Sequence, residues 1–395
     1  MSSRRTQSGP ETASRGPRVL ASRPMVLVLF ASFFTMVGFY LLLSVVPLYA
    51  AESGGGNSGA GLATAAFMLS TVLAQLGMPR VMARFGYRTV LAAGLLLLGI
   101  PAFLYGPLGE VQEILAITLV RGAGFGAAIV ALAALVTELA PPERRGEALG
   151  LYGVALTLPT VFCGALGLWI VERWGFAPVF LVGAVAPLLA ALAALGVTEP
   201  DRREQEGAGL LRTLFGRPSL LRIFVLFTSC TAVSGVVVTF LPLSAPGPGF
   251  FSAATALLLL GVSATIFRWW AGRLGDRRDP RVLLVPGLLC AALGMAALSL
   301  GPGLALLGGA LIFGAGFGML QNTTLLLTMQ RVPKSEYGLG STLWNLAFDA
   351  GTGAGAFLFG FVVGAAGFSW TYVLCAVLLV ATIALVPGTR ADKLS

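Results

Sequence analysis

Twelve apolar stretches, each about 20 residues long or longer, run through this chain. A helix needs about 20 apolar residues to cross the hydrocarbon core of a bilayer, and its backbone polar groups must be satisfied within the helix. The pattern therefore predicts an all-α membrane protein with twelve transmembrane helices. The expected spans are 25–50, 59–81, 89–107, 112–138, 147–171, 176–197, 219–243, 250–271, 281–300, 304–328, 337–364 and 368–387.

Composition supports this fold class, because 56% of the residues are hydrophobic and only 11% are charged. An average soluble domain has about 25% charged residues. No soluble fold of 395 residues could bury this much apolar surface.

The basic residues predict the orientation of the spans. Of the 26 Lys and Arg residues, all but Arg121 and Arg173 fall in the terminal tails, in the central linker or around loops on one side, and Arg268 is one of five that surround the eighth loop. Such residues concentrate on the cytoplasmic side of a membrane. We therefore expect a multi-pass protein of the cell inner (cytoplasmic) membrane with both termini cytoplasmic. The net charge of +9 reflects this topology and not a nucleic-acid-binding surface.

The chain contains an internal repeat. Residues Gly122–Gly126 read Gly-Ala-Gly-Phe-Gly and recur as Gly314–Gly318 at an offset of 192 residues, and Pro141 matches Pro333 at the same offset. Repeats of this kind are typical of secondary transporters that bind their substrate between two halves. The expected organisation is a disordered basic cytoplasmic tail (1–24), a six-helix half (25–197), a cytoplasmic linker (198–218), a pseudo-symmetric six-helix half (219–388) and a cytoplasmic tail (389–395).

Two loops carry a family resemblance. The segment Gly272-Arg-Leu-Gly-Asp-Arg-Arg-Asp-Pro-Arg281 is similar to the loop signature of the major facilitator superfamily, with Asp279 in place of the usual second glycine. The first-half copy, 79–88, has Ala83 in place of the signature aspartate. Segments 141–153, 321–324 and 344–351 resemble bacterial efflux-type members. The resemblance spans essentially the whole chain and implies the superfamily fold and a transport function.

The loop signature predicts a gating latch. A carboxylate at a helix end can pair with an arginine of the other half and oppose opening on the cytoplasmic side. By pseudo-symmetry we expect Asp276 to face Arg144 or Arg145. The first-half copy, with Arg84 and Arg88, should be weaker because Ala83 accepts no hydrogen bond. The alternative is a set of solvated loop charges worth less than about 1 kcal/mol.

Asp349 is the main candidate for a functional residue. It lies about 18 Å along the eleventh predicted span, near the middle of the membrane. An ionisable side chain there costs about 2.5–3.5 kcal/mol and points to function. The chain has no histidine, so proton coupling must use carboxylates. We predict that Asp349 carries the coupled proton or binds a cationic substrate group; the alternative is a structural Asp bonded to neighbouring helices.

Other polar and aromatic residues at similar depth predict a substrate site. Arg121 either binds an anionic substrate group or neutralises Asp349, and the structural alternative has it extending toward Glu113. For the aromatic residues the alternative is ordinary packing. The expected substrate-binding residues are Arg121, Asn345, Gln321, Asn322, Gln75, Trp344, Tyr40 and Phe39.

The sequence favours proton-coupled export of a small amphipathic or drug-like molecule by alternating access. Sparse polar residues argue against a sugar. Two alternatives stay open: proton-coupled uptake of an organic acid or sugar, and a non-transporting sensor or lipid-handling protein. The sequence has no nucleophile–base set, phosphate loop or metal motif, so we expect no enzyme activity, catalytic residue, cofactor or metal. The expected partners are the small-molecule substrate, protons and the lipid bilayer, with the protein a monomer.

Overall fold

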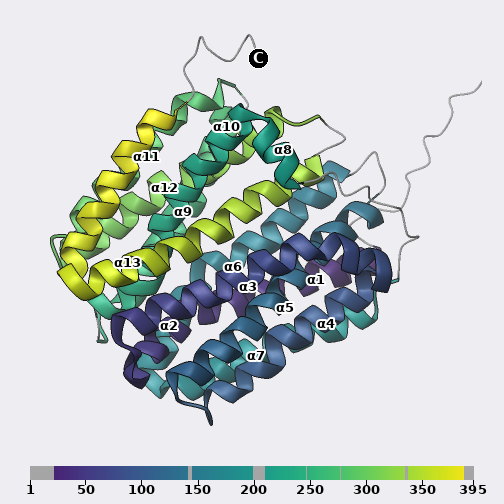
Figure 1. Cartoon of the computed structure of the whole chain (residues 1–395), viewed down its shortest axis with the longest axis horizontal. Coiled ribbons are helices and arrows are strands. Elements are labelled where there is room, and N and C mark those ends of the chain that lie inside the picture. The colour runs from purple at the N-terminus through teal and green to yellow at the C-terminus, as the bar shows by residue number, and fades with distance from the viewer. Residues whose placement is uncertain are drawn as a thin grey trace, which may run out of the picture.

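The computed structural model describes residues 22–140, 145–198, 210–245, 247–275, 277–333 and 337–386, apart from the side chains of 145, 146, 149 and 210–212. These residues form helices and no strand, in two groups, α1–α7 and α8–α13, that lie side by side (Figure 1). The helices are α1 (Arg23–Leu43), α2 (Val45–Ala50), η2 (Ala51–Gly55), α3 (Gly56–Phe85), α4 (Tyr87–Gly99), η3 (Ile100–Tyr105), α5 (Val111–Leu139), α6 (Arg145–Trp174), α7 (Phe176–Leu195), α8 (Leu210–Gly216), α9 (Pro218–Ser244), α10 (Ala253–Gly275), η5 (Pro280–Leu283), α11 (Leu284–Leu298), α12 (Leu304–Gln330), α13 (Tyr337–Thr382) and η7 (Ile383–Leu385).

Ten continuous stretches of the described chain are long and apolar enough to cross a membrane. Two of them, Arg23–Phe85 with 63 residues and Tyr337–Leu385 with 49, are too long for one crossing. The first breaks near Gly54, where φ is 97°, and the second at Gly367, where φ is 79°. Left-handed backbone of this kind suits glycine, which has no Cβ to clash. Each long stretch thus has the length for two crossings, and the ten accommodate the twelve predicted spans.

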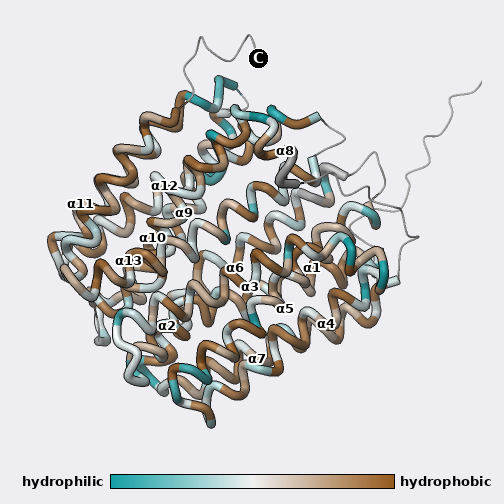
Figure 2. The backbone as a smooth tube through the Cα atoms, in the orientation of Figure 1, coloured by the Kyte–Doolittle hydropathy of each residue, from teal (hydrophilic) through white to brown (hydrophobic). Residues whose placement is uncertain are grey.

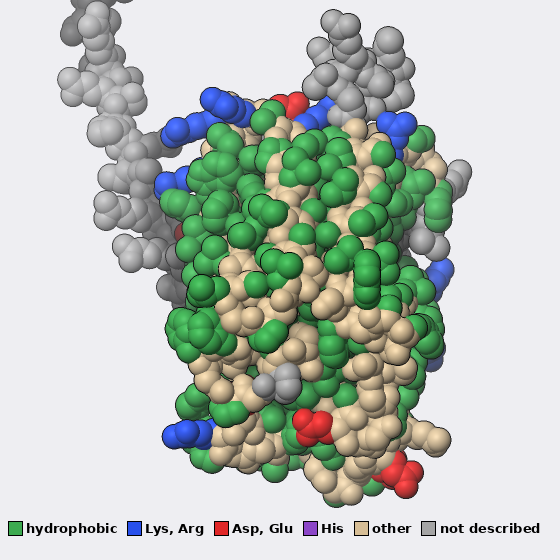
Figure 3. Space-filling model, turned by 90° about the vertical axis from the view of Figure 1, so that its left-hand side faces the viewer, with side chains coloured by type: hydrophobic (Ala, Val, Ile, Leu, Met, Phe, Trp, Pro, Cys, Tyr) green, Lys and Arg blue, Asp and Glu red, His purple; other side chains and the backbone are tan. Residues whose placement is uncertain are grey.

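Apolar side chains cover the sides of the molecule. Leu73, Leu192 and Leu293 are each more than 60% exposed. Figure 3 shows a flank rich in hydrophobic side chains, with most of its Lys and Arg at one end, and Figure 2 shows hydrophilic residues mainly at the helix ends. Apolar surface of this extent is unfavourable in water and suits lipid. The predicted fold class, an all-α multi-pass membrane protein, is confirmed.

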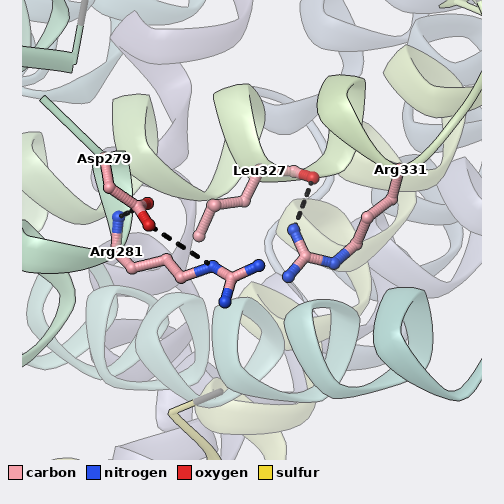
Figure 4. A network of polar contacts seen from close by, with 4 residues as sticks. All are labelled: Asp279, Arg281, Leu327 and Arg331. Carbon is pink, nitrogen blue, oxygen red and sulfur yellow. Dashed lines mark hydrogen bonds and ion pairs between the residues drawn. The ribbon is translucent and has the colours of Figure 1, made fainter. Parts of the chain in front are cut away.

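One end of the bundle, called the basic end below, is where α3, α10 and α12 end and α4 and η5 begin. Here Asp279 caps η5: its Oδ1 accepts a hydrogen bond from the backbone N of Arg281 at 2.9 Å, and its Oδ2 lies 3.9 Å from Arg281 Nε (Figure 4). Nearby, Arg331 Nη1 donates to the carbonyl oxygen of Leu327 at 3.0 Å (Figure 4). Asp279 departs from the loop signature, and its side chain here serves as a helix cap.

The predicted latch stays a prediction. Asp276 and Arg144 lie outside the described residues, and the side chain of Arg145 is not described. Arg84 is exposed, with its guanidinium carbon 5.3 Å from the centre of the Phe85 ring. Arg88 is half-buried in the first turn of α4.

The predicted tails and linker fall largely outside the described residues. Of the predicted tail 1–24, residues 23 and 24 belong to α1, and the tail 389–395 is not described. The linker 198–218 includes the short helix α8. Leu214 of α8 is buried against residues of the C-terminal half, which are Leu220, Val332 and Leu343.

The repeated glycines lie where helices approach most closely, and they do so in the same way in both halves. An added Cβ at these positions would collide with the neighbouring helix, so only glycine permits the approach. The matching contacts are Gly122 with Phe67 and Ser70, Gly314 with Leu260 and Ser263, Gly124 with Gly94 and Leu98, and Gly316 with Gly287 and Ala291. The glycines repeat at an offset of 192 residues and their partners at 193. The sequence repeat therefore corresponds to two halves with the same internal packing.

Replacing Gly316 by alanine is expected to lower the melting temperature of the purified protein. The new Cβ would lie 2.6 Å from the carbonyl oxygen of Gly287 and 2.9 Å from Ala291 Cα, and overpacking of this kind costs about 1–3 kcal/mol. Gly308 is the matched control, because it lies in the same helix with open space around it. Gly308→Ala should be neutral or slightly stabilising. Equal melting temperatures for the two variants in detergent would contradict this packing.

Candidate functional site

Asp349 lies on the face of α13 that contacts the N-terminal half. Small residues continue this face at helical spacing and pack on α3. The two helices are antiparallel, so residues later in α13 contact residues earlier in α3. The contacts are Gly353 with Met68, and Ala356 and Gly360 with Gly61. Small residues allow the two backbones to approach closely. Toward the basic end, Gln75 and Asp349 continue this row of contacts.

The side chains of Gln75 and Asp349 form a hydrogen bond between the two halves. Gln75 Nε2 donates to Asp349 Oδ2 at 2.7 Å. Both residues are buried, with 4% and 6% of their surfaces exposed. Gln75 Oε1 has no partner among the described residues. Asp349 Oδ1 accepts no hydrogen bond from the described residues, and it is not one of the fully buried polar atoms there. It is therefore accessible to solvent. The structure thus holds a largely buried carboxyl by one amide donor and leaves its other oxygen accessible.

The opposite face of α13 is fixed against α9. Gly351 and Gly355 approach the α9 backbone at Thr228 and Ala232, and Thr231 Oγ1 donates to the carbonyl oxygen of Ala347 at 3.1 Å. Because α13 is held in this way within its own half, the position of the Asp349 carboxyl relative to Gln75 depends on how the two halves pack.

Arg121, in contrast, is sealed inside the N-terminal half, with 2% of its surface exposed. Its Nε donates to the carbonyl oxygen of Leu98 at 3.1 Å and its Nη1 to the Tyr105 hydroxyl at 3.3 Å. Its guanidinium carbon lies 5.7 Å from the centre of the Phe67 ring. Arg121 therefore ties α5 to α4 and η3, and among the described residues it hydrogen-bonds neither Asp349 nor Glu113. Glu113, the expected structural partner, instead accepts a hydrogen bond from the backbone N of Glu110.

Phe39 belongs to the same region as Arg121. Its ring stacks on Phe125 at 4.2 Å and lies 5.5 Å from Phe67, so it forms part of a packed aromatic cluster. Phe39, Arg121 and Thr64 line a small pocket. Within the described residues, Arg121 Nη2 has no hydrogen-bond partner. These two predicted substrate residues thus lie in a pocket of the N-terminal half, whereas Asp349 lies between the halves.

Arg268 is a functional candidate that the sequence analysis missed. It was counted with the loop arginines at the end of the predicted span 250–271, but it lies within α10, seven residues before the helix ends, and it is half-buried. Its Nη1 donates to Gln321 Oε1 at 3.2 Å, and its guanidinium carbon lies 5.9 Å from the centre of the Trp344 ring. The assignment was wrong because an Arg near a helix end usually extends to the interface, and only the packing of α10 turns this one inward.

The repeat could have identified Arg268. At the offset of 193 residues that relates α3 to α10, Arg268 corresponds to Gln75. Both are polar residues at equivalent places in helices of equivalent role. A search for polar residues at matched positions of the two halves would have paired them.

Trp344 forms a rigid support beside Arg268. It stacks on Phe227 with ring centres 4.7 Å apart and planes at 19°. Its Nε1 donates to Thr324 Oγ1 at 3.1 Å. Asp349 lies a little more than one helical turn after Trp344 in α13. The Arg268 guanidinium and the Asp349 carboxyl therefore share one region of the interface.

Tyr40 connects this region to the N-terminal half. The half-buried phenol lies within electrostatic range of both Arg268 and Asp349. Asn345 is half-buried one turn before Asp349. Asn322 faces Gly272 of α10, with Nδ2 3.2 Å from the position of an added Cβ. The structure therefore brings together six residues of the interface, which are Tyr40, Gln75, Arg268, Gln321, Trp344 and Asp349, and we call them the central site.

Comparison with known proteins agrees with this architecture. The family model of the Major Facilitator Superfamily matches residues 28–356. The staphylopine export protein of Staphylococcus aureus is 22% identical over 350 residues, which cover 85% of this chain and 88% of that protein. An uncharacterized MFS-type transporter of Methanocaldococcus jannaschii is 21% identical over 369 residues, 89% of this chain and 94% of that protein.

A solved structure shows the same fold. The bacterial homolog of the human lysosomal transporter Spinster, in an inward-facing and occupied conformation, superposes with a TM-score of 0.78 at 17% identity, over 94% of this chain and 97% of that one. The family match over residues 28–356 shows that the chain belongs to the major facilitator superfamily.

Proposed function

We propose that this protein is a proton-coupled transporter that exports a small amphipathic molecule by alternating access. The observation that carries the proposal is the hydrogen bond between Gln75 and Asp349. It joins the two halves through a carboxyl inside a membrane span, where an ionisable residue is costly and therefore points to function.

Protonation of Asp349 would change the strength of this contact. A hydrogen bond to an ionised group is worth about 1.5–3 kcal/mol, and one between neutral groups about 0.5–1.5 kcal/mol. A difference of about 1–2 kcal/mol changes the balance between two conformations by a factor of about 5–30. The state of one carboxyl is thus enough to bias whether the halves stay closed at Gln75.

The other contacts between the halves support alternating access. Thr64 Oγ1 and Thr239 Oγ1 lie 2.8 Å apart, and Gly261 approaches the carbonyl oxygen of Val161. These contacts lie farther from the basic end than Gln75 and Asp349 do. If the basic end is cytoplasmic, as the distribution of Lys and Arg indicates, the described contacts close the outer end, and the central site can load from the cytoplasm.

The similarity to the staphylopine export protein, which covers 85% of this chain, supports export over uptake. The central site has one acid, one cation, two amides and two aromatic side chains, which suits an amphipathic molecule better than a sugar. Proton-coupled uptake of an organic acid remains the second candidate, because an accessible arginine lies in the site.

Asp349→Asn is expected to abolish coupled transport in everted membrane vesicles with an acidified lumen. Adding a transported compound from a panel of dyes, antibiotics, organic acids and sugars should alkalinise the lumen in the wild type. The amide removes the titrating group but keeps the size of the side chain, so Gln75 can still bond it. Asp279→Asn is the matched control, because that residue is 54% exposed at the basic end.

The outcome of this assay is decisive for the proton site. Wild-type alkalinisation by Asp349→Asn would show that Asp349 does not carry the proton. A compound that moves with protons in the same direction would instead establish uptake symport.

A cross-link between residues 64 and 239 is expected to stop transport. In a background without the four native cysteines, Thr64→Cys and Thr239→Cys should form a disulfide, because the hydroxyl oxygens they replace are 2.8 Å apart and an S–S bond is about 2.05 Å long. Transport should return with dithiothreitol, and each single variant should tolerate the oxidant. Normal transport by fully cross-linked protein would mean that the halves need not separate there.

A further inference from the structure

We propose that the central site binds a zwitterion, with the carboxylate of the substrate at Arg268 and its cationic amine at Asp349. This inference rests on the proposed transport function and names its substrate class. It starts from one arrangement: two opposite charges occupy the same interface and are not paired with each other.

Arg268 has no acidic partner in the described part of the chain. The ion pair found there within 4.0 Å is Arg281 with Asp279, at the basic end. A guanidinium carries five N–H donors, and Gln321 accepts from Nη1 only. Arg121 Nη2 is fully buried and has no hydrogen-bond partner among the described residues. None of the other nitrogens of Arg268 is buried and unpaired in this way. Arg268 thus offers accessible donors, and Arg121 does not.

The aromatic support orients these donors. Trp344 is held by Phe227 on one side and by Thr324 at its N–H, and the guanidinium of Arg268 lies over its ring. A guanidinium is planar by itself, and an aromatic ring beneath it restricts its direction, which suits bidentate binding of a carboxylate. An apolar or aromatic body of the substrate would then contact Trp344 and Tyr40.

Asp349 supplies the opposite charge. Its Oδ2 accepts from Gln75, and its Oδ1 has no protein donor within the described residues. An ammonium group can donate to that oxygen. The amine and the coupled proton would compete for the same carboxyl, which is the condition for exchange of substrate against protons.

A membrane interior disfavours a cation and an anion that are left apart. A substrate with one charge would compensate only one of them. A zwitterion compensates both at once, and a neutral amphipathic molecule compensates neither. The structure therefore predicts a preference that a purely apolar site would not show.

A four-ligand comparison tests the proposal on the detergent-purified full chain by isothermal titration calorimetry. The probes are 4-(aminomethyl)benzoate with both charges, 4-(aminomethyl)benzamide with the amine only, 4-methylbenzoate with the carboxylate only and 4-methylbenzamide with neither. Phenylalanine is added as a zwitterion with more closely spaced charges. At least one zwitterion should bind about tenfold or more tightly than its singly charged analogues.

Two variants assign the charges. Arg268→Gln should remove the preference for carboxylate over amide and keep the preference for the amine, and Asp349→Asn should do the reverse. Arg273→Gln is the matched control: it lies on the same helix, its guanidinium is 4.0 Å from the centre of the Trp269 ring, and it is exposed. It should keep both preferences. Size-exclusion profiles and melting temperatures establish that each variant is folded.

The proposal is wrong if no zwitterion binds more tightly than its analogues, or if the carboxylate preference survives Arg268→Gln. Its failure is separable from failure of the transport function, because binding in detergent needs no proton gradient. The predicted binding pattern without any proton movement in vesicles would leave this site in place and overturn the coupled transport. Coupled transport without the pattern would overturn the zwitterion site alone.

Discussion

The contact between α3 and α13 is the constraint on which the central site depends. Small residues bring the two helices together, and the row of contacts reaches its most polar pair at Gln75 and Asp349. Close packing there excludes water from most of the carboxyl, while one of its oxygens stays accessible. The interface therefore combines two properties that a proton carrier needs: an environment that is sensitive to charge, and a route for the proton.

The two halves share their packing but differ in their polar residues. Equivalent glycines hold α5 against α3 and α12 against α10, so the framework repeats. At one pair of equivalent positions the chain has Gln75 in the first half and Arg268 in the second. A symmetric framework with asymmetric charges gives the central site an acid and a base contributed by the C-terminal half, with an amide and a phenol facing them from the N-terminal half.

The same residue type has two roles here because burial differs. Arg121 donates hydrogen bonds to Leu98 and Tyr105 and links three helical segments. Arg268 keeps donors accessible above a fixed indole ring. Burying a guanidinium within the membrane is unfavourable in free energy in both places. Only the accessible guanidinium can offset this by binding a ligand. Charge within a span is thus a weaker guide to substrate binding than charge that stays accessible.

The sequence by itself determined the fold class and the repeat, and it predicted Asp349, Gln75, Gln321, Trp344 and Tyr40 as site residues. These follow from apolar length, from the cost of charge in lipid and from a fixed offset, which are all properties along the chain. Only the tertiary structure decided that Gln75 bonds Asp349, that Arg121 is sealed with Phe39 in one half, and that Arg268 turns inward. The reason is that the rotation of a helix about its axis, which decides where a side chain points, is set by the helices packed against it.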